Sequence, residues 1–163
     1  MSDVPLKQEI ARELRDSGQE LVRQLRLLPE RHFDAGRYEN GWNARQILAH
    51  VAAIEWTYPR LLDIPRSAPP AGGAGEPPTH QAQGGIDAYN ARQVERRAGT
   101  PIADLIDEFE RNRAATIAAV EGADEDLLAQ PIRSAGGRTG PLARVMHEVA
   151  IEHVRGHLRD ILG

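Results

Sequence analysis

Cysteine is absent from this sequence of 163 residues. A disulfide framework, a thiolate metal site and a cysteine nucleophile are therefore excluded. Aromatic residues make up only 4% of the chain, and no stretch alternates apolar and polar residues for long, so the pattern does not favour β-strands. The chain also has no apolar signal core near Met1 and no run that approaches the roughly 20 apolar residues of a membrane span. We expect a cytoplasmic protein with no membrane partner.

The sequence also has no long segment in which charges of one sign are concentrated. The net charge is −4, and acidic residues are interleaved with the basic ones along the whole chain. The chain offers no basic face to a nucleic-acid backbone, so we expect no nucleic-acid partner. The length fits one domain, residues 1–163, that buries a core of its own.

Helical periodicity is what the sequence does contain, in four segments. The first covers residues 5–28 and ends before Pro29. The second begins at Asn43, which with Gln46 resembles a capping box, and Pro59 is expected to kink or shorten its last turn. The third, residues 86–121, is two helices or one broken helix, with an N-terminus at Thr100-Pro101. The fourth runs from Thr139 or Pro141 to Leu162.

The segments between these helices are rich in glycine, proline and polar residues. Residues 65–85 contain five prolines and five glycines, which predicts a linker long enough to cross a whole bundle. The helices on either side of it could therefore run parallel. Shorter loops are expected at residues 30–41 and 134–140, and a single turn at residues 124–130. The sequence predicts an all-α helical bundle.

Three histidines are the candidate functional residues. At 100° per residue, His153 and His157 fall near the middle of the apolar face of the last helix, and their spacing of four stacks them on one side. His50 lies beside the apolar stripe of the second helix and should also point inward. Such a set can hold one divalent ion with positions left open, whereas each histidine alone could equally be a hydrogen-bonded core residue.

The other three histidines are weaker candidates. His147 begins a His-Glu pair, but Ile151 stands where a metalloprotease motif needs its second histidine. His147 is expected on the flank of the last helix, whereas His32 and His80 fall in predicted loops and are expected to be exposed. A di-metal carboxylate site is not expected, because the glutamates of the last helix face outward.

Two motifs resemble those of the DinB/YfiT-like superfamily. Residues 42–50 (WNARQILAH) resemble the opening of its second helix, and residues 152–161 (EHVRGHLRDI) resemble its closing helix. Residues 124–127 are similar to its approach to the last loop. The resemblance implies a four-helix bundle with a long crossover between helices two and three. It also implies that His50, His153 and His157 bind zinc or nickel, and that the protein forms a homodimer.

The resemblance implies metal-dependent chemistry on a small-molecule substrate, with a low-molecular-weight thiol such as mycothiol, bacillithiol or glutathione. We expect the chain, which ends at Gly163, to be without the further C-terminal domain of mycothiol-dependent isomerases, so a thiol S-transferase or a hydrolase is the leading hypothesis. Tyr58, Glu55 and Asp160 are candidates for groups that support the ligands. The alternatives are a non-enzymatic stress-response module that binds a metal or ligand, and a metal-free interaction bundle.

Overall fold

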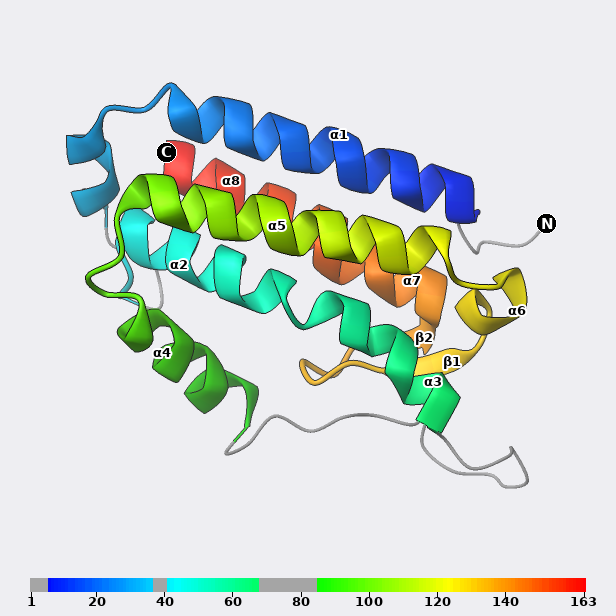
Figure 1. Ribbon diagram of the computed structural model, residues 1–163. Helices are drawn as coiled ribbons and strands as arrows, with labels where there is room; N and C mark the ends of the chain where they lie inside the picture. The colour runs from blue at the N-terminus through cyan, green and yellow to red at the C-terminus, as the bar shows by residue number, and fades with distance from the viewer. Residues whose placement is uncertain (1–5, 37–40, 68–84) are drawn as a thin grey trace.

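The computed structural model describes residues 6–36, 41–67 and 85–163, and these residues are predominantly helical (Figure 1). The first helix, α1, spans Lys7–Arg26. Its buried face carries Ile10, Leu14, Leu21 and Leu25 at helical spacing, and Ser17 and Gly18 fill the gap between Leu14 and Leu21 on the same face. The loop expected after it is partly wrong, because Glu30–Asp34 form a 3₁₀ turn, η1, that buries Phe33.

The second helix, α2, spans Ala44–Glu55 and confirms the predicted N-terminus. The Asn43 side chain accepts from the Gln46 backbone N–H, and the Gln46 side chain accepts from the Asn43 N–H, both at 2.9 Å. The shortening expected near Pro59 is also observed, because a 3₁₀ turn, η2 (Tyr58–Leu62), and a short helix, α3 (Asp63–Ser67), follow α2. Proline lacks the N–H and the space that an α-helical turn needs there.

The third helical region is two helices, one of the two expected forms. These are α4 (Ile86–Arg96) and α5 (Ile102–Glu121), so α5 begins just after Pro101 and ends at Gly122. The predicted linker lies mostly outside the described residues, but residues 65–67 belong to α3 and Gly85, at φ +90°, precedes α4. The turn expected at residues 124–130 contains the short helix α6 (Glu125–Leu128).

The loop expected at residues 134–140 is partly wrong, because residues 134–138 form the turn of a small hairpin and residues 139–140 belong to its second strand. Its strands, β1 (Pro131–Arg133) and β2 (Thr139–Pro141), pair antiparallel with Ile132 opposite Gly140. The Ser134 N–H donates to the Arg138 carbonyl at 2.8 Å, and Gly137 adopts φ +91°, which favours glycine. Strands of three residues are too short to show alternation, so the sequence did not reveal them.

The last helical rod changes from α-helix to π-helix and back to α-helix. It consists of α7 (Leu142–Met146), a π-helical segment η3 (His147–Glu152) and α8 (His153–Leu162), which follow one another without a break. The extra residue that a π turn holds rotates everything after it relative to an α-helix.

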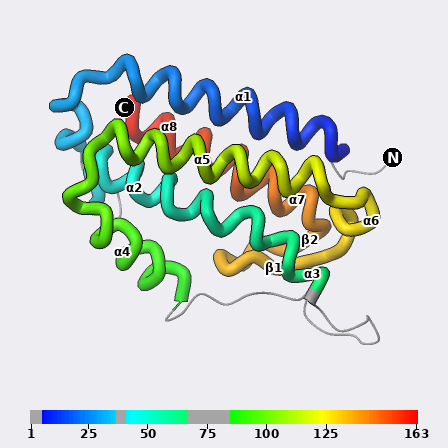
Figure 2. Tube along the Cα trace, in the orientation of Figure 1, coloured from blue at the N-terminus to red at the C-terminus, as the bar shows by residue number. Residues whose placement is uncertain are grey.

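Four long elements form the bundle: α1, α2, α5 and the α7–η3–α8 rod (Figures 1 and 2). Both α1 and α2 pack against α5 and against the last rod. The helices α2 and α5 run in the same direction, as the predicted crossover allows, while α1 and the last rod run in the opposite one. The helix α4 packs outside the bundle against α2. No helix in the described part of the chain is long and apolar enough to cross a membrane.

Candidate metal centre

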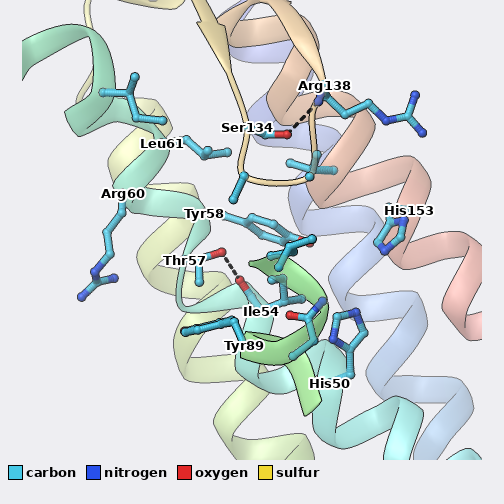
Figure 3. A pocket seen from close by; sticks show the side chains of 16 residues that line it. His50, Ile54, Thr57, Tyr58, Arg60, Leu61, Tyr89, Ser134, Arg138 and His153 are labelled. Carbon is cyan, nitrogen blue, oxygen red and sulfur yellow. Dashed lines mark hydrogen bonds between the residues drawn. The ribbon is translucent and has the colours of Figure 1, made fainter. Parts of the chain in front are cut away.

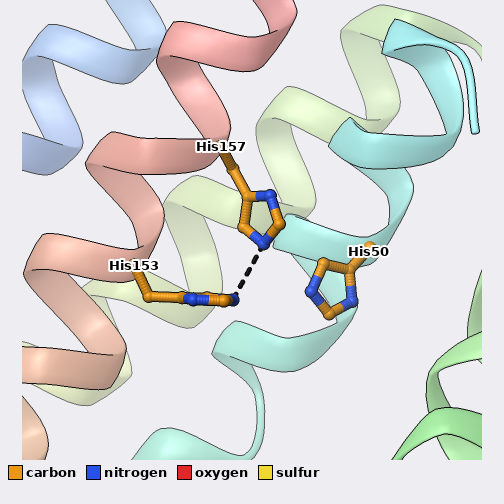
Figure 4. A group of neighbouring side chains, drawn as sticks. All are labelled: His50, His153 and His157. Carbon is orange, nitrogen blue, oxygen red and sulfur yellow. Dashed lines mark hydrogen bonds between the residues drawn. The ribbon is translucent and has the colours of Figure 1, made fainter. Parts of the chain in front are cut away.

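His50, His153 and His157 meet between two helices of the bundle (Figure 4). His50 comes from α2, and the other two come from consecutive turns of α8. One ring nitrogen from each lies within 4.8 Å of the other two. The His50 ring centroid is 4.9 Å from that of His157 and 6.3 Å from that of His153. The structure thus brings together the three residues that the sequence singled out.

The spacing of these nitrogens suits a shared ion. Two nitrogens that each lie about 2.1 Å from one ion are separated by about 3.0 Å at a right angle and about 3.4 Å at the tetrahedral angle. The Nε2 atoms of His153 and His157 are 2.9 Å apart. The same distance allows one neutral ring to donate a hydrogen bond to the other when no ion is bound. His50 offers a third nitrogen within 4.8 Å of the other two, so ring movements that shorten these separations would bring it into the same coordination sphere.

The electrostatic setting keeps the imidazoles neutral, which is the form that binds metals. Burial, followed by the charge of His153, lowers the pKa of His50 to about 4. Burial, followed by the charges of His50 and His153, lowers the pKa of His157 to about 3. The pKa of His153 is also lowered, mainly by partial desolvation of its ring and then by the charge of Arg138. A cation would therefore not have to displace protons near neutral pH.

The prediction that His153 and His157 lie near the middle of the buried face is wrong. His153 is exposed and His157 is partly buried, while Val154, Leu158 and Ile161 carry the buried face of α8. The π-helical segment immediately before His153 is the physical reason, because a projection at 100° per residue does not carry across its wider turns. Both histidines consequently lie at the edge of the core, where a ligand can reach them.

A buried network around Arg113 connects the two helices that supply the histidines. Arg113, on α5, donates from Nη2 to the carbonyl of Ala150 in the π-helical segment at 2.7 Å. Its Nε lies 2.8 Å from Oε1 of Glu55, which is on α2 and fully buried. The same Glu55 oxygen accepts from the Thr116 hydroxyl at 3.0 Å. Both Glu55 and Arg113 occupy apolar stripes at helical spacing, a sequence signal that could have indicated the pair.

The three residues expected to support the ligands lie in different places. Glu55 belongs to the Arg113 network. Tyr58 is buried beside that network and lines a pocket next to His50; burial, with the charge of Glu55, raises its pKa far above the usual range. Asp160 lines a groove with His153 and His157. Tyr58 and Asp160 therefore lie near the histidine cluster in two different cavities, Tyr58 in the pocket and Asp160 in the groove.

A pocket of about 440 Å³ opens on one side of the cluster. Its walls come from α2, η2, α4, the hairpin turn and the π-helical segment, and His50 and His153 lie at one end (Figure 3). The polar groove is the second hollow and contains His153 and His157 together with charged side chains of α8. The contributions of α4 and the hairpin to this site were not predicted, because both belong to segments without a functional motif.

The remaining histidines do not join the cluster. His147 is partly buried, with Nε2 3.0 Å from a carboxylate oxygen of Glu13 on α1, in agreement with its expected place on the helix flank. His32 was expected to be exposed but is partly buried, with Nε2 2.5 Å from the Ile161 carbonyl oxygen. His80 lies outside the described residues.

Solved structures with a similar fold cover 99% of this chain. A mycothiol-dependent maleylpyruvate isomerase matches with a TM-score of 0.75 at 20% identity, and a histidine-to-alanine mutant of such an enzyme matches with 0.73 at 19%. This chain spans 63% of the length of each. YfiT from Bacillus subtilis, described as a probable metal-dependent hydrolase with an unusual four-helix bundle topology, matches with 0.75 at 11% identity over 89% of its length. At these identities the likeness shows the fold.

A search of curated proteins gave no match. The sequence model of one family, the mycothiol maleylpyruvate isomerase N-terminal domain, matches residues 14–161. Together with the bundle shared with YfiT, this match confirms the resemblance to the DinB/YfiT-like superfamily. The chain belongs to the mycothiol maleylpyruvate isomerase N-terminal domain family.

Proposed function

We propose that this protein is a metal-dependent enzyme in which His50, His153 and His157 bind one zinc or nickel ion. The observation that carries the proposal is the convergence of three ring nitrogens within 4.8 Å at the junction of two hollows. Three protein ligands leave at least one coordination position for a reactant, which is typical of catalytic and not of structural sites.

The proposed reaction is attack by water or by a small-molecule thiol on a small electrophilic substrate. A divalent ion supplies Lewis acidity, which lowers the pKa of a water or thiol beside it. Since the chain has no cysteine, a thiol must come from a molecule such as mycothiol, bacillithiol or glutathione. In the transfer reaction a carbon–sulfur bond forms, and the leaving group departs with its electron pair and takes up the thiol proton. In hydrolysis, water replaces the thiol.

The residues of this chain would hold and orient the reactants. Trp42 packs against His50, with ring centroids 5.3 Å apart, and limits the movement of that imidazole. Tyr58 keeps its proton, because burial raises its pKa, so its hydroxyl is a permanent hydrogen-bond donor at the wall of the pocket. It is suited to binding a substrate oxygen.

Metal analysis of protein purified without a histidine tag tests the centre. We expect the wild type to bind one equivalent of zinc or nickel, and His50→Ala, His153→Ala and His157→Ala each to lose most of it. His147→Ala is the matched control on the same helical rod and should bind as the wild type does. Equal metal content in His50→Ala, His153→Ala and the wild type would sink the proposal.

Assays with the three thiols against a panel of electrophiles, before and after chelation, test the reaction. Turnover that is lost with the metal and restored by adding it back supports the enzyme. Metal binding without turnover of any thiol or of water would instead favour a metal-binding stress-response module.

We also propose that the protein acts on its small-molecule substrate as a cytoplasmic homodimer. This follows from the family resemblance, and light scattering of the purified protein tests the dimer directly. A monomer mass at micromolar concentration would contradict it.

A further inference from the structure

Two hollows of opposite character meet at the histidine cluster. The pocket of about 440 Å³ and the polar groove of about 360 Å³ share two lining residues, His153 and Arg138. His50 belongs to the pocket alone and His157 to the groove alone. A reactant in either hollow can therefore reach the same group of imidazole nitrogens.

The pocket is walled mainly by hydrocarbon. Six aliphatic side chains and two tyrosine rings line it, and the aliphatic ones are Ile54, Leu61, Ile64, Ile86, Ala135 and Val149. Two arginines also border it, but in Figure 3 the side chains of Arg60 and Arg138 extend away from the space between Tyr58 and His50. The volume is in the range of small-molecule sites. The aliphatic and aromatic walls between Tyr58 and His50 favour an apolar body.

The groove has the opposite composition. Glu148, Glu152 and Asp160 line it together with Arg138 and Arg159, and it reaches His153 and His157 from the outer side of α8. A hydrophilic molecule would keep its polar groups hydrated or hydrogen-bonded there, and an apolar one would gain little.

We infer that the substrates of this centre are amphiphiles, with an alkyl or aryl body in the pocket and a single polar reacting group at His50 and His153. The hydrophilic co-reactant, water or thiol, reaches the centre through the groove. The inference rests on the proposed function for the identity of the centre, but the binding of an alkyl chain in the pocket does not depend on a metal.

A series of straight-chain hydroxamates on the zinc-loaded protein measures the contribution of the pocket by calorimetry. The hydroxamate head binds the metal in every member, and only the chain grows, from acetohydroxamate to octanohydroxamate. A buried methylene strengthens binding by up to roughly three- to fourfold, so we expect octanohydroxamate to bind at least about 30-fold more tightly than acetohydroxamate.

A pair of variants on α4 locates the chain. Ile86→Glu places a carboxylate in the pocket wall, whereas Ala88→Glu places the same charge on the exposed side of the same helix. The ratio of the affinities for octanohydroxamate and acetohydroxamate should fall by roughly tenfold or more in Ile86→Glu, because a charge in an apolar wall disfavours hydrocarbon beside it. In Ala88→Glu this ratio should stay as in the wild type. An unchanged ratio in Ile86→Glu would overturn the inference.

Octan-1-ol added to the metal-free wild type separates the pocket from the metal. We expect saturable shifts of the methyl resonances of Ile54, Leu61 and Ile86 in NMR spectra, and no saturable shift of Leu27 on the far surface. If octan-1-ol leaves these methyls unmoved, or if acetohydroxamate and octanohydroxamate bind equally well, the pocket does not take the apolar body. If no hydroxamate binds but octan-1-ol does, the proposed metal centre fails and the pocket inference stands.

Discussion

Arg113 donates a hydrogen bond to the carbonyl of Ala150, three residues before His153, at 2.7 Å. The same guanidinium pairs with Glu55, five residues after His50, at 2.8 Å. One side chain of α5 thus fixes the helix that carries His50 against the rod that carries His153. It also binds a carbonyl of the π-helical segment, where the hydrogen-bonding pattern of an α-helix is interrupted.

Replacing Arg113 with methionine should destabilise the protein by about 3 kcal/mol or more, because Glu55 would remain buried without its partner. The double variant Arg113→Met with Glu55→Met should recover a large part of this loss, since hydrocarbon of similar size replaces both charges. Urea denaturation of the metal-free proteins measures both effects. Arg111→Met, on the exposed side of the same helix, is the control and should change stability by less than about 0.5 kcal/mol. A double variant no more stable than the single one would contradict the expectation.

The stability of the metal-free protein should fall as the pH decreases from 6.5 towards 4. Burial lowers the pKa of His50 from 6.5 to about 4, so the unfolded chain takes up a proton in this window before the folded one does. The stability contribution is present above pH 6.5 and is lost as the pH falls through about 4. Unfolding free energies measured across this range should decrease less steeply in His50→Gln than in the wild type. Parallel curves for the two proteins would rule out this role of His50.

Glu55 should make the opposite contribution to the pH dependence of stability. Burial raises its pKa from 4.5 to about 7, against the opposing charge of Arg113. Its contribution is therefore present below pH 4.5 and is lost as the pH rises through about 7. In Glu55→Gln, stability should rise more steeply with pH between 4.5 and 7 than it does in the wild type. A shallower rise would show that the folded pKa of Glu55 is not raised.

Trp42 should report metal binding directly, because its ring centroid lies 5.3 Å from that of His50. The chain has two tryptophans, and Trp56→Phe leaves Trp42 as the single emitter. Titration of this variant with paramagnetic nickel should quench the emission with a one-to-one end point. Trp42→Phe, which keeps Trp56, should show little quenching. Quenching of equal size in both variants would place the ion elsewhere.

Two helical glycines should respond oppositely to alanine. At Gly156, on α8, an added Cβ would meet only the end of the Arg159 side chain at 3.7 Å, so alanine should stabilise the helix by about 0.5–1 kcal/mol. At Gly18, on α1, it would lie 3.1 Å from Cγ of Arg113, a side chain held by Glu55 and Ala150. Gly18→Ala should therefore gain nothing or lose stability. Thermal unfolding of both variants tests this, and a gain at Gly18 equal to that at Gly156 would show that Arg113 shifts freely.

The sequence predicted the helices well where local signals were strong. The Asn43–Gln46 capping box placed the start of α2, and the composition of residues 65–85 allowed the parallel arrangement of α2 and α5. These features depend on neighbours within a few residues or on the length of a linker. Periodicity also brought His50, His153 and His157 together as candidates, although their role as ligands stays a prediction.

The exposure of the histidines could not be obtained in this way. The π-helical segment before His153 changes the helical projection, and it is held by a contact between Arg113 and Ala150 that joins residues far apart in the chain. The hairpin and the packing of α4 are likewise long-range features, and the pocket is made largely from them. Sequence periodicity therefore identified the candidate ligands but did not predict the pocket beside them.

The histidines contributed by α2 and α8 are separated by most of the chain. During synthesis, a nascent chain would carry only His50 of these three histidines until the last rod emerged, and one imidazole holds a metal weakly. The proposed coordination by all three histidines would require α8 to have docked against α2. Tight metal binding would then be among the last steps of folding. A tightly bound ion would indicate that the four-helix bundle of that molecule is fully formed.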